Sequence, residues 1–266
     1  MPAPRSRQER STGLARALSK LGFCSRREAW DLIKAGRVRL NGVVQRDPER
    51  RVALGRDRIE VDGQAVRSER KVYLLLNKPR GLVTTTSDEQ GRETVFECFT
   101  GQDLPFVSPV GRLDKASEGL LLFTNDTVWA ARITAPEKHL DKTYHVQVDC
   151  QADARLMEQM SNGVTADDGF LAAKQVRLLR HGSKNSWLEV VLDEGKNRHI
   201  RRLLAALGVN VLRLVRVAIG PLLLGAVAKG EFRHLTDEEV RAVAVPASPT
   251  PRSCTRERAG HQAGGK

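Results

Sequence analysis

The stretch Gly111–Asp126, GRLDKASEGLLLFTND, is the densest motif of the 266-residue chain, and the rest of the sequence is interpreted outward from it. Its polar half carries Asp114, and its apolar half, Leu120 to Phe123, has the pattern of a buried strand. A carboxylate in a loop anchored by such a strand is typical of catalytic groups. An aspartate in a loop is nevertheless more often a turn or cap residue, so the sequence around the motif must decide its role.

Strands and a few helices surround the motif between residues 71 and 245. Apolar patterning predicts strands over residues 71–79, 120–123, 143–148, 187–192 and 211–217. It predicts helices near residues 127–133, 152–160, 198–207 and 237–242. Because strands and helices do not alternate strictly, we expect an α+β catalytic domain with a largely antiparallel sheet and a central cleft.

The first 70 residues have the signals of a smaller domain. Leu14 to Leu21 shows helical apolar spacing and ends at Gly22, and Ser25 with Glu28 forms a capping box before a helix that ends near Gly36. Two hairpins are predicted after these helices, at the Asn-Gly pair 41–42 and the Asp-Gly pair 62–63. The sequence therefore predicts a small α-α-β domain over residues 13–70, a catalytic domain over residues 71–245, and disordered tails at residues 1–12 and 246–266.

Charge points to a polyanionic partner. The formal net charge is +12, and the first 70 residues hold 17 Lys and Arg against 9 Asp and Glu. A membrane surface is the competing polyanion, but the sequence shows neither an apolar run long enough to span a bilayer nor a signal peptide, so we expect a cytoplasmic nucleic-acid-binding protein. The cations placed to follow a phosphate backbone are Arg26, Arg27, Lys34, Arg37 and Arg39.

A second basic segment lies between Gly195 and Gly230, which contains no acidic residue. Within it, Ile200, Leu203, Leu204 and Leu207 form the buried stripe of a helix. Arg198 and Arg202 lie opposite that stripe, whereas Arg201 lies on its flank and can turn toward an internal site. The alternative is that Arg201 only lies along the edge of the core with its guanidinium in water.

Two resemblances make these patterns specific. LSKLGFCSRREAWDLIKAGRVRLNGVV, residues 18–44, resembles the alpha-L RNA-binding motif of a small-subunit ribosomal protein. GRLDKASEGLLLFTND, together with LNKPRGLVTTTSD, KTYHVQV and EGKNRHIRRLL in their order along the chain, resembles the ribosomal RNA pseudouridine synthases that carry such a domain at the amino terminus. The resemblance spans residues 13–240.

The resemblance implies roles for particular residues. Asp114 is then the catalytic carboxylate, Tyr144 packs against the target base after it is flipped out, and Arg201 pairs with Asp114, with Arg198 as the alternative partner. Arg112 is expected to help evert the base or to grip a phosphate. The further expected RNA contacts are Lys78, Arg80, Lys142, Lys196, Arg198 and Arg202.

Several other classes of protein fit less well. No two of the four cysteines are close enough in sequence to form a metal or redox motif, and no Gly-rich phosphate loop is present, so we expect neither a metal nor a cofactor. A glycosidic-bond hydrolase needs a second carboxylate, for which Glu118 is the nearest candidate. A noncatalytic RNA-binding protein of ribosome assembly is the main alternative. The expected partner is ribosomal RNA, bound by a monomer whose amino-terminal domain is connected flexibly near residues 68–70.

Overall fold

The computed structural model describes residues 11–244, apart from residues 87, 136, 138 and 167–168. The tails predicted at residues 1–12 and 246–266 therefore lie outside the described residues, except for Ser11 and Thr12. Thr12 belongs to strand β1 (Thr12–Gly13), which pairs with β4 (Arg51–Val52). The ordered amino-terminal domain thus includes at least one residue that the sequence assigned to the tail.

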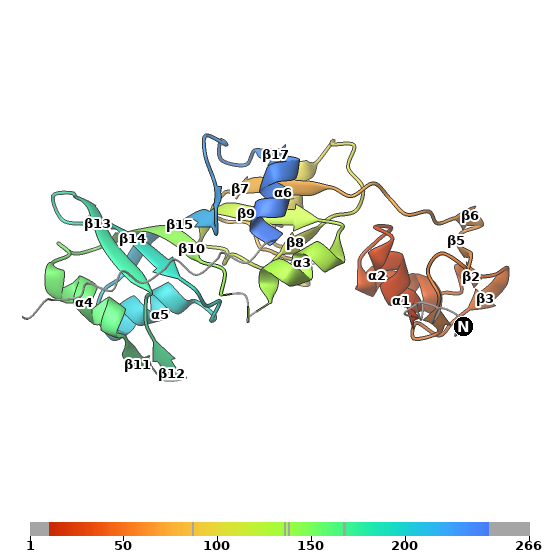
Figure 1. The fold of residues 1–266 in the computed structure, drawn as a ribbon, viewed down its shortest axis with the longest axis horizontal. Coiled ribbons are helices and arrows are strands. Elements are labelled where there is room, and N and C mark those ends of the chain that lie inside the picture. Colours follow the sequence, from red (N-terminus) through yellow and green to blue (C-terminus); the bar gives the residue numbers. More distant parts are fainter. Residues whose placement is uncertain (1–10, 87, 136, 138, 167–168, 245–266) are drawn as a thin grey trace, which may run out of the picture.

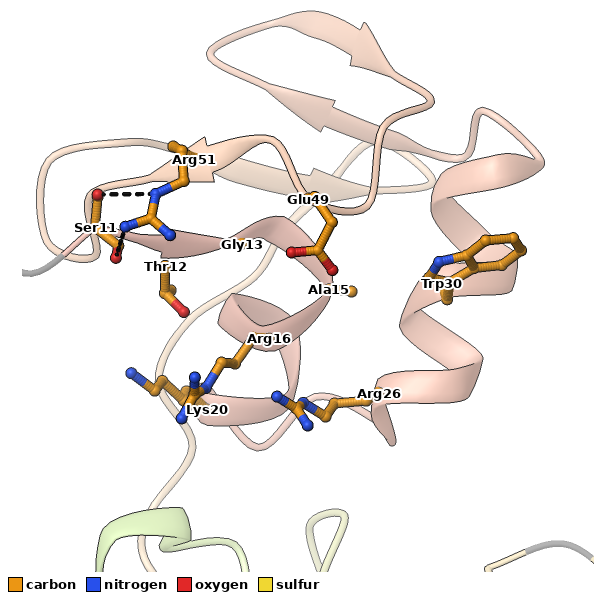
Figure 2. Close-up of a pocket in the computed structure, with 10 residues that line it drawn as sticks. All are labelled: Ser11, Thr12, Gly13, Ala15, Arg16, Lys20, Arg26, Trp30, Glu49 and Arg51. Atoms are coloured by element: carbon orange, nitrogen blue, oxygen red, sulfur yellow. Dashed lines mark hydrogen bonds between the residues drawn. The ribbon is translucent and has the colours of Figure 1, made fainter.

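The amino-terminal domain has the predicted α-α-β order. Helix α1 (Leu14–Lys20) is followed by α2 (Arg26–Lys34), whose capping box joins Ser25 and Glu28 as the sequence predicted. Figure 2 shows these helices at close range. A four-stranded antiparallel sheet follows in the order β3-β2-β5-β6. Its strands are β2 (Val38–Leu40), β3 (Val43–Gln45), β5 (Ile59–Val61) and β6 (Gln64–Ala65).

The catalytic domain is built on one large sheet with the strand order β13-β14-β10-β15-β9-β7-β17. Its neighbours are antiparallel, as predicted, except that β9 and β15 run parallel. The main strands are β7 (Tyr73–Lys78), β9 (Glu118–Thr124), β10 (Lys142–Val148), β13 (Gln175–His181), β14 (Ser186–Leu192), β15 (Val211–Ile219) and β17 (Phe232–His234). The short strands β8 (Ser108–Val110) and β16 (Leu222–Leu223) pair with β9 and β15.

Helices and loops cover both faces of this sheet. Helices α3 (Thr127–Thr134) and α6 (Asp237–Ala244) pack beside Leu75 and Leu120, while the 3-10 helix η1 (Val95–Phe99) packs near Leu74 and Leu121. Helices α4 (Ala154–Asn162) and α5 (His199–Ala206) cover the β10–β14 end, far from the amino-terminal domain (Figure 1). Burial on both faces explains why β7 and β9 are continuous apolar runs rather than alternating ones.

The parallel contact between β9 and β15 depends on Gly119. A Cβ atom at this position would lie 2.3 Å from the carbonyl oxygen of Arg216, and the φ of Gly119 is +99°. Both the close approach of the backbone and the positive φ require glycine. This pairing was not predicted from the sequence, because it joins residues almost a hundred positions apart.

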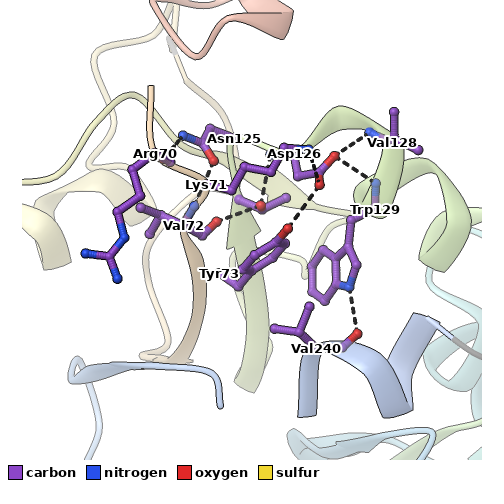
Figure 3. Close-up of polar contacts among 10 residues, drawn as sticks. Arg70, Lys71, Val72, Tyr73, Asn125, Asp126, Val128, Trp129 and Val240 are labelled. Carbon is purple, nitrogen blue, oxygen red and sulfur yellow. Dashed lines mark hydrogen bonds and ion pairs between the residues drawn. The ribbon is translucent and has the colours of Figure 1, made fainter. Parts of the chain in front are cut away.

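The connection between the two domains is hydrogen-bonded, although the sequence predicted a flexible one. Glu69 donates its N–H to the carbonyl of Leu21 at 3.0 Å. The Asn125 side chain donates to the Arg70 carbonyl at 2.8 Å and accepts from the N–H of Val72 at 2.9 Å (Figure 3). One amide side chain thus holds the chain where it enters β7.

The strands that the sequence analysis did not predict lie mostly at the edges of the catalytic domain. They include β13, β17 and the small hairpin of β11 (Val164–Ala166) and β12 (Gly169–Leu171). β13 alternates only weakly between exposed and half-buried residues, so it lacks the apolar periodicity of a central strand. Within the part of the chain that the structure describes, no helix is long and apolar enough to cross a membrane.

Candidate active site

Asp114 lies in the connection between β8 and β9. The N–H of Ser117 donates to the Asp114 carbonyl at 2.9 Å and closes a tight turn just before β9 begins. The Asp114 side chain is 36% exposed, so the carboxylate is partly buried and still accessible to a substrate. The position agrees with the expectation of a carboxylate anchored by a buried strand.

The segment after β7 holds this loop by its main chain. Thr84 donates its hydroxyl to the Leu113 carbonyl at 2.7 Å and accepts the Leu113 N–H at 3.4 Å. The N–H of Gly81 donates to the Lys115 carbonyl at 2.8 Å. Two separate motifs of the sequence, LNKPRGLVTTTSD and GRLDKASEGLLLFTND, therefore fold against each other. The role of Thr84 was missed, because a threonine within a run of three carries no local signal of a long-range contact.

Lys78 also holds the loop, and the prediction that it contacts RNA is wrong. Its side chain is fully buried, and its ammonium donates to the carbonyls of Pro79 and Ser117, each at 2.9 Å. Burial lowers the pKa of Lys78 to about 8, against an opposing influence of Cys98, Glu118 and Asp114. A lysine enclosed in this way stabilises the turn from inside the protein and cannot reach a phosphate outside it.

The two arginines near Asp114 have different contacts. Arg198 precedes α5 with a left-handed backbone, φ 47°, and its Nη1 lies 4.0 Å from Asp114 Oδ2. Arg201 is half-buried and donates from Nη2 to the Ala116 carbonyl at 3.0 Å. Within the described residues the direct ion pair is therefore made by the alternative partner, Arg198. Arg201 does turn inward, as its place on the helix flank predicted, rather than lying along the core edge.

Charge around Arg201 is dominated by other cations. Burial lowers the pKa of Arg201, and Arg198 and Arg80 lower it further, while Asp114 opposes them. An anion is therefore favoured beside these three arginines, and Asp114 is the carboxylate whose charge acts on Arg201. The positive field also suits an RNA phosphate.

Tyr144 lies on β10 where two parts of the core meet, and it is partly buried. Its cross-strand neighbour on β15 is Arg216, and directly opposed residues of antiparallel strands share a face of the sheet. Arg216 is 6% exposed; Nε donates to the Leu120 carbonyl at 2.8 Å, but Nη2 has no hydrogen-bond partner among the described residues. A buried donor without a partner is uncommon, which makes Arg216 a candidate to donate to a polar group of a substrate; no such role was predicted from the sequence.

Glu118 has a structural environment. It is 3% exposed, forms a two-pronged pair with Arg213 at 3.0 Å, and lies 2.5 Å from the Lys229 ammonium. Burial raises the pKa of Glu118, but the hydrogen bonds from the two cations outweigh this effect and leave it lowered. A carboxylate occupied by two cations is poorly placed to activate water, which removes the support for a hydrolase.

The other cations predicted to contact RNA are either exposed or already bonded to another group of the protein. Exposed side chains in both domains include Arg26, Arg39, Lys34, Arg80 and Arg112. Others already have partners: Arg27 pairs with Glu89, Arg37 with Asp62, and Lys196 with Glu194. Arg202 donates to the Asn197 carbonyl at 3.0 Å, and Lys142 is half-buried, with a pKa lowered by burial and then by Arg216.

Within the described residues, no group of three or more His, Cys, Asp or Glu side chains is arranged to hold a metal ion. The candidate site combines a carboxylate on a braced loop with Arg198 and Arg201, and Tyr144 lies on β10 opposite Arg216. This combination suits acid-base or nucleophilic chemistry on a polyanion.

Comparison with known proteins defines the class. Residues 72–206 match the model of RNA pseudouridylate synthases, and residues 12–59 match that of the S4 domain. The chain belongs to the RNA pseudouridylate synthase family, and it is an isomerase that acts on uridine in RNA.

Its relatives match along most of their length. An uncharacterized RNA pseudouridine synthase of Aquifex aeolicus (strain VF5) is 40% identical over 84% of this chain and 90% of its own. Ribosomal large subunit pseudouridine synthase B of Bacillus subtilis (strain 168) is 36% identical over 86% of this chain and 93% of its own. A solved crystal structure of a pseudouridylate synthase, 27% identical, superposes with a TM-score of 0.62 over 88% of this chain and 100% of its own.

Proposed function

We propose that the protein converts a specific uridine of ribosomal RNA to pseudouridine, with Asp114 as the catalytic carboxylate. The observation that carries this proposal is the loop of Asp114, whose main chain is held by Thr84, Gly81 and Arg201. Holding a reactive group in one geometry is a principal source of catalytic rate. The ribosomal target is supported by the similarity to the large-subunit enzyme of Bacillus subtilis.

The chemistry needs few groups. The bond between N1 of uracil and C1′ of ribose breaks, the base rotates, and C5 bonds to C1′; the proton of C5 is lost and N1 gains one. Since the product is an isomer, no electrons are gained or lost, and one carboxylate acting as nucleophile or base suffices. Arg198 and Arg201 place positive charge beside the Asp114 carboxylate.

The target uridine must leave its helix or loop to reach Asp114, because the reacting atoms are enclosed by neighbouring bases in folded RNA. In this proposal Tyr144 receives the face of the flipped base. The unpaired Nη2 of Arg216, on the cross-strand neighbour of Tyr144, donates to an oxygen of the bound nucleotide. The protein would act as a monomer in the cytoplasm, on RNA that is folded or partly assembled.

The test is pseudouridine mapping on transcripts of small-subunit and large-subunit ribosomal RNA, incubated with the protein and no added cofactor. The proposal expects one defined new pseudouridine in one of the two RNAs. If naked RNA is not modified, partly assembled subunits are the second substrate. Absence of modification on both, with RNA binding intact, would favour the noncatalytic assembly protein.

A further inference from the structure

A pocket of about 680 Å³ lies on the amino-terminal domain, away from Asp114 (Figure 2). It is formed by α1, the first half of α2 and the chain around β1 and β4. The side chains that give it chemical character are Arg16, Lys20, Arg26, Trp30, Glu49 and Arg51. Only Arg26 among them was expected to contact RNA, so the pocket is a feature that the active site does not explain.

Three of the cations that line the pocket lack counter-ions within the part of the chain that the structure describes. The side chains of Arg16, Lys20 and Arg26 gather on one side of it (Figure 2), and none of them has an ion pair or hydrogen bond to another described residue. Glu49 is the one carboxylate among the lining residues, and it lies against the backbone of Gly13. Like charges brought together repel, and a phosphate placed among them relieves that repulsion.

An aromatic ring stands at the same pocket. Trp30 is 47% exposed, which is unusual for a side chain of this size on a small domain. The Lys34 ammonium lies 5.0 Å from its ring centre. An exposed indole beside cations is the combination that binds the face of a nucleic-acid base.

Helix geometry explains why these groups meet. Arg16 and Lys20 are four residues apart on α1, and Arg26 and Trp30 are four residues apart on α2. Residues at this spacing lie on the same face of a helix. Each helix therefore presents one pair of side chains to the pocket between them, and the tight turn at Gly22 brings the two faces together.

We propose that this pocket binds one unpaired nucleotide of the RNA substrate, with a backbone phosphate on Arg16, Lys20 and Arg26 and the base stacked on Trp30. The inference rests on the proposed function only in taking RNA as the ligand. The nucleotide is unpaired because a base inside an A-form helix is covered by its neighbours and offers no free face. The amino-terminal domain thus recognises a bulge, loop or single-stranded stretch rather than a continuous duplex.

The probes are a labelled single-stranded oligouridylate and an RNA duplex of the same length, titrated into the full-length protein. Trp30→Leu is expected to weaken binding of the single strand about tenfold, because stacking of one base contributes that much. Trp30→Phe retains an aromatic face and should retain most of the affinity. Quenching of tryptophan fluorescence by the oligonucleotide should be smaller in Trp30→Phe than in the wild type.

The proposed phosphate contacts are tested with one triple variant, in which Arg16, Lys20 and Arg26 are each replaced by glutamine. The matched control replaces Arg50, Arg56 and Arg58, which removes the same charge from the same domain outside the pocket. The pocket variant should lower the slope of log affinity against log salt by about 0.7, since one neutralised phosphate of a single strand contributes about that much. The control variant should lower the slope clearly less. Urea midpoints of all variants establish that they fold.

Unchanged affinity in Trp30→Leu, equal slopes in the pocket and control variants, or duplex binding that depends on Trp30 would each overturn the proposal. These outcomes are separable from failure of the proposed function, because every variant retains Asp114. If the wild type forms no pseudouridine but the pocket variants lose oligonucleotide affinity, the pocket stands and the catalytic proposal falls.

Discussion

The position of Asp114 is fixed mainly by hydrogen bonds to the peptide groups of its loop. Its loop is bonded by Lys78 from inside, by Thr84 and Gly81 from one motif, and by Arg201 from α5. The ion pair between Asp114 and Arg198, at 4.0 Å, is longer than these hydrogen bonds. We therefore expect catalysis to be sensitive to the residues that hold the loop as well as to those that touch the substrate.

Arg201 provides a direct test at the level of one residue. Arg201→Lys keeps the positive charge but loses the fixed geometry of the guanidinium that reaches the Ala116 carbonyl. We expect kcat to fall at least about tenfold with little change in RNA affinity. Arg202→Lys, on the next residue of the same helix, is the matched control and should keep near-normal kcat. Equal kcat in the two variants would show that Arg201 does not position the loop.

Lys78 predicts a dependence of stability on pH. Its pKa is about 8 in the folded protein and near 10.5 when unfolded, so between these values the unfolded chain binds more protons. Stability should therefore rise as pH increases from about 8 to 10.5, by up to roughly 3 kcal/mol from this one group. The measurement is urea unfolding across this range for the wild type and Lys78→Met. The difference between them should depend on pH; a constant difference would contradict the account of Lys78 as a buried cation.

The contrast between Asp114 and Lys78 shows how far single residues can be predicted from sequence. Asp114 and Arg201 were predicted to belong to the site because they lie in motifs whose order along the chain is specific, and their roles stay predictions. Lys78 was misassigned because the sequence Asn-Lys-Pro looks the same whether the lysine is exposed or enclosed. Its burial follows from contacts with Ser117, which lies 39 positions away.

At the level of elements, the segment after β7 acts as a brace for the loop of Asp114. Thr84→Val removes the hydroxyl that bonds the carbonyl and the N–H of Leu113, and valine keeps the shape of the threonine side chain. We expect kcat to fall by about tenfold to a hundredfold, because a small displacement of the loop misplaces the carboxylate. Thr84→Ser keeps the hydroxyl and should restore most of the rate. If the valine variant matches the wild type in kcat, the brace has no catalytic role.

Helix starts and hairpins were predicted well where they depend on residues close together in the sequence. The capping box at Ser25 and the hairpin at Asn41 each depend on residues within a few positions. The parallel pairing of β9 with β15 does not, since it depends on a glycine that lets two distant backbones approach. Edge strands such as β13 were missed because they are only partly buried.

At the level of the whole molecule, the amino-terminal domain and the catalytic sheet lie in one extended arrangement (Figure 1). The first 70 residues hold a net charge of +8, two thirds of the excess, so they should supply much of the affinity for RNA. Removing residues 1–70 should weaken RNA binding while leaving the catalytic domain folded, as measured by filter binding and circular dichroism. A folded truncation with the affinity of the full chain would contradict this division of roles.

The central claim, that Asp114 carries the reaction, is tested most directly by comparing wild type with Asp114→Asn on the RNA that the wild type modifies. The substitution keeps the size of the side chain and removes its charge and nucleophilicity. The measurement is pseudouridine formation at the defined site, with RNA affinity determined in parallel. The account predicts that Asp114→Asn binds the RNA normally and forms no detectable pseudouridine. Pseudouridine formed by this variant at the wild-type rate would contradict it.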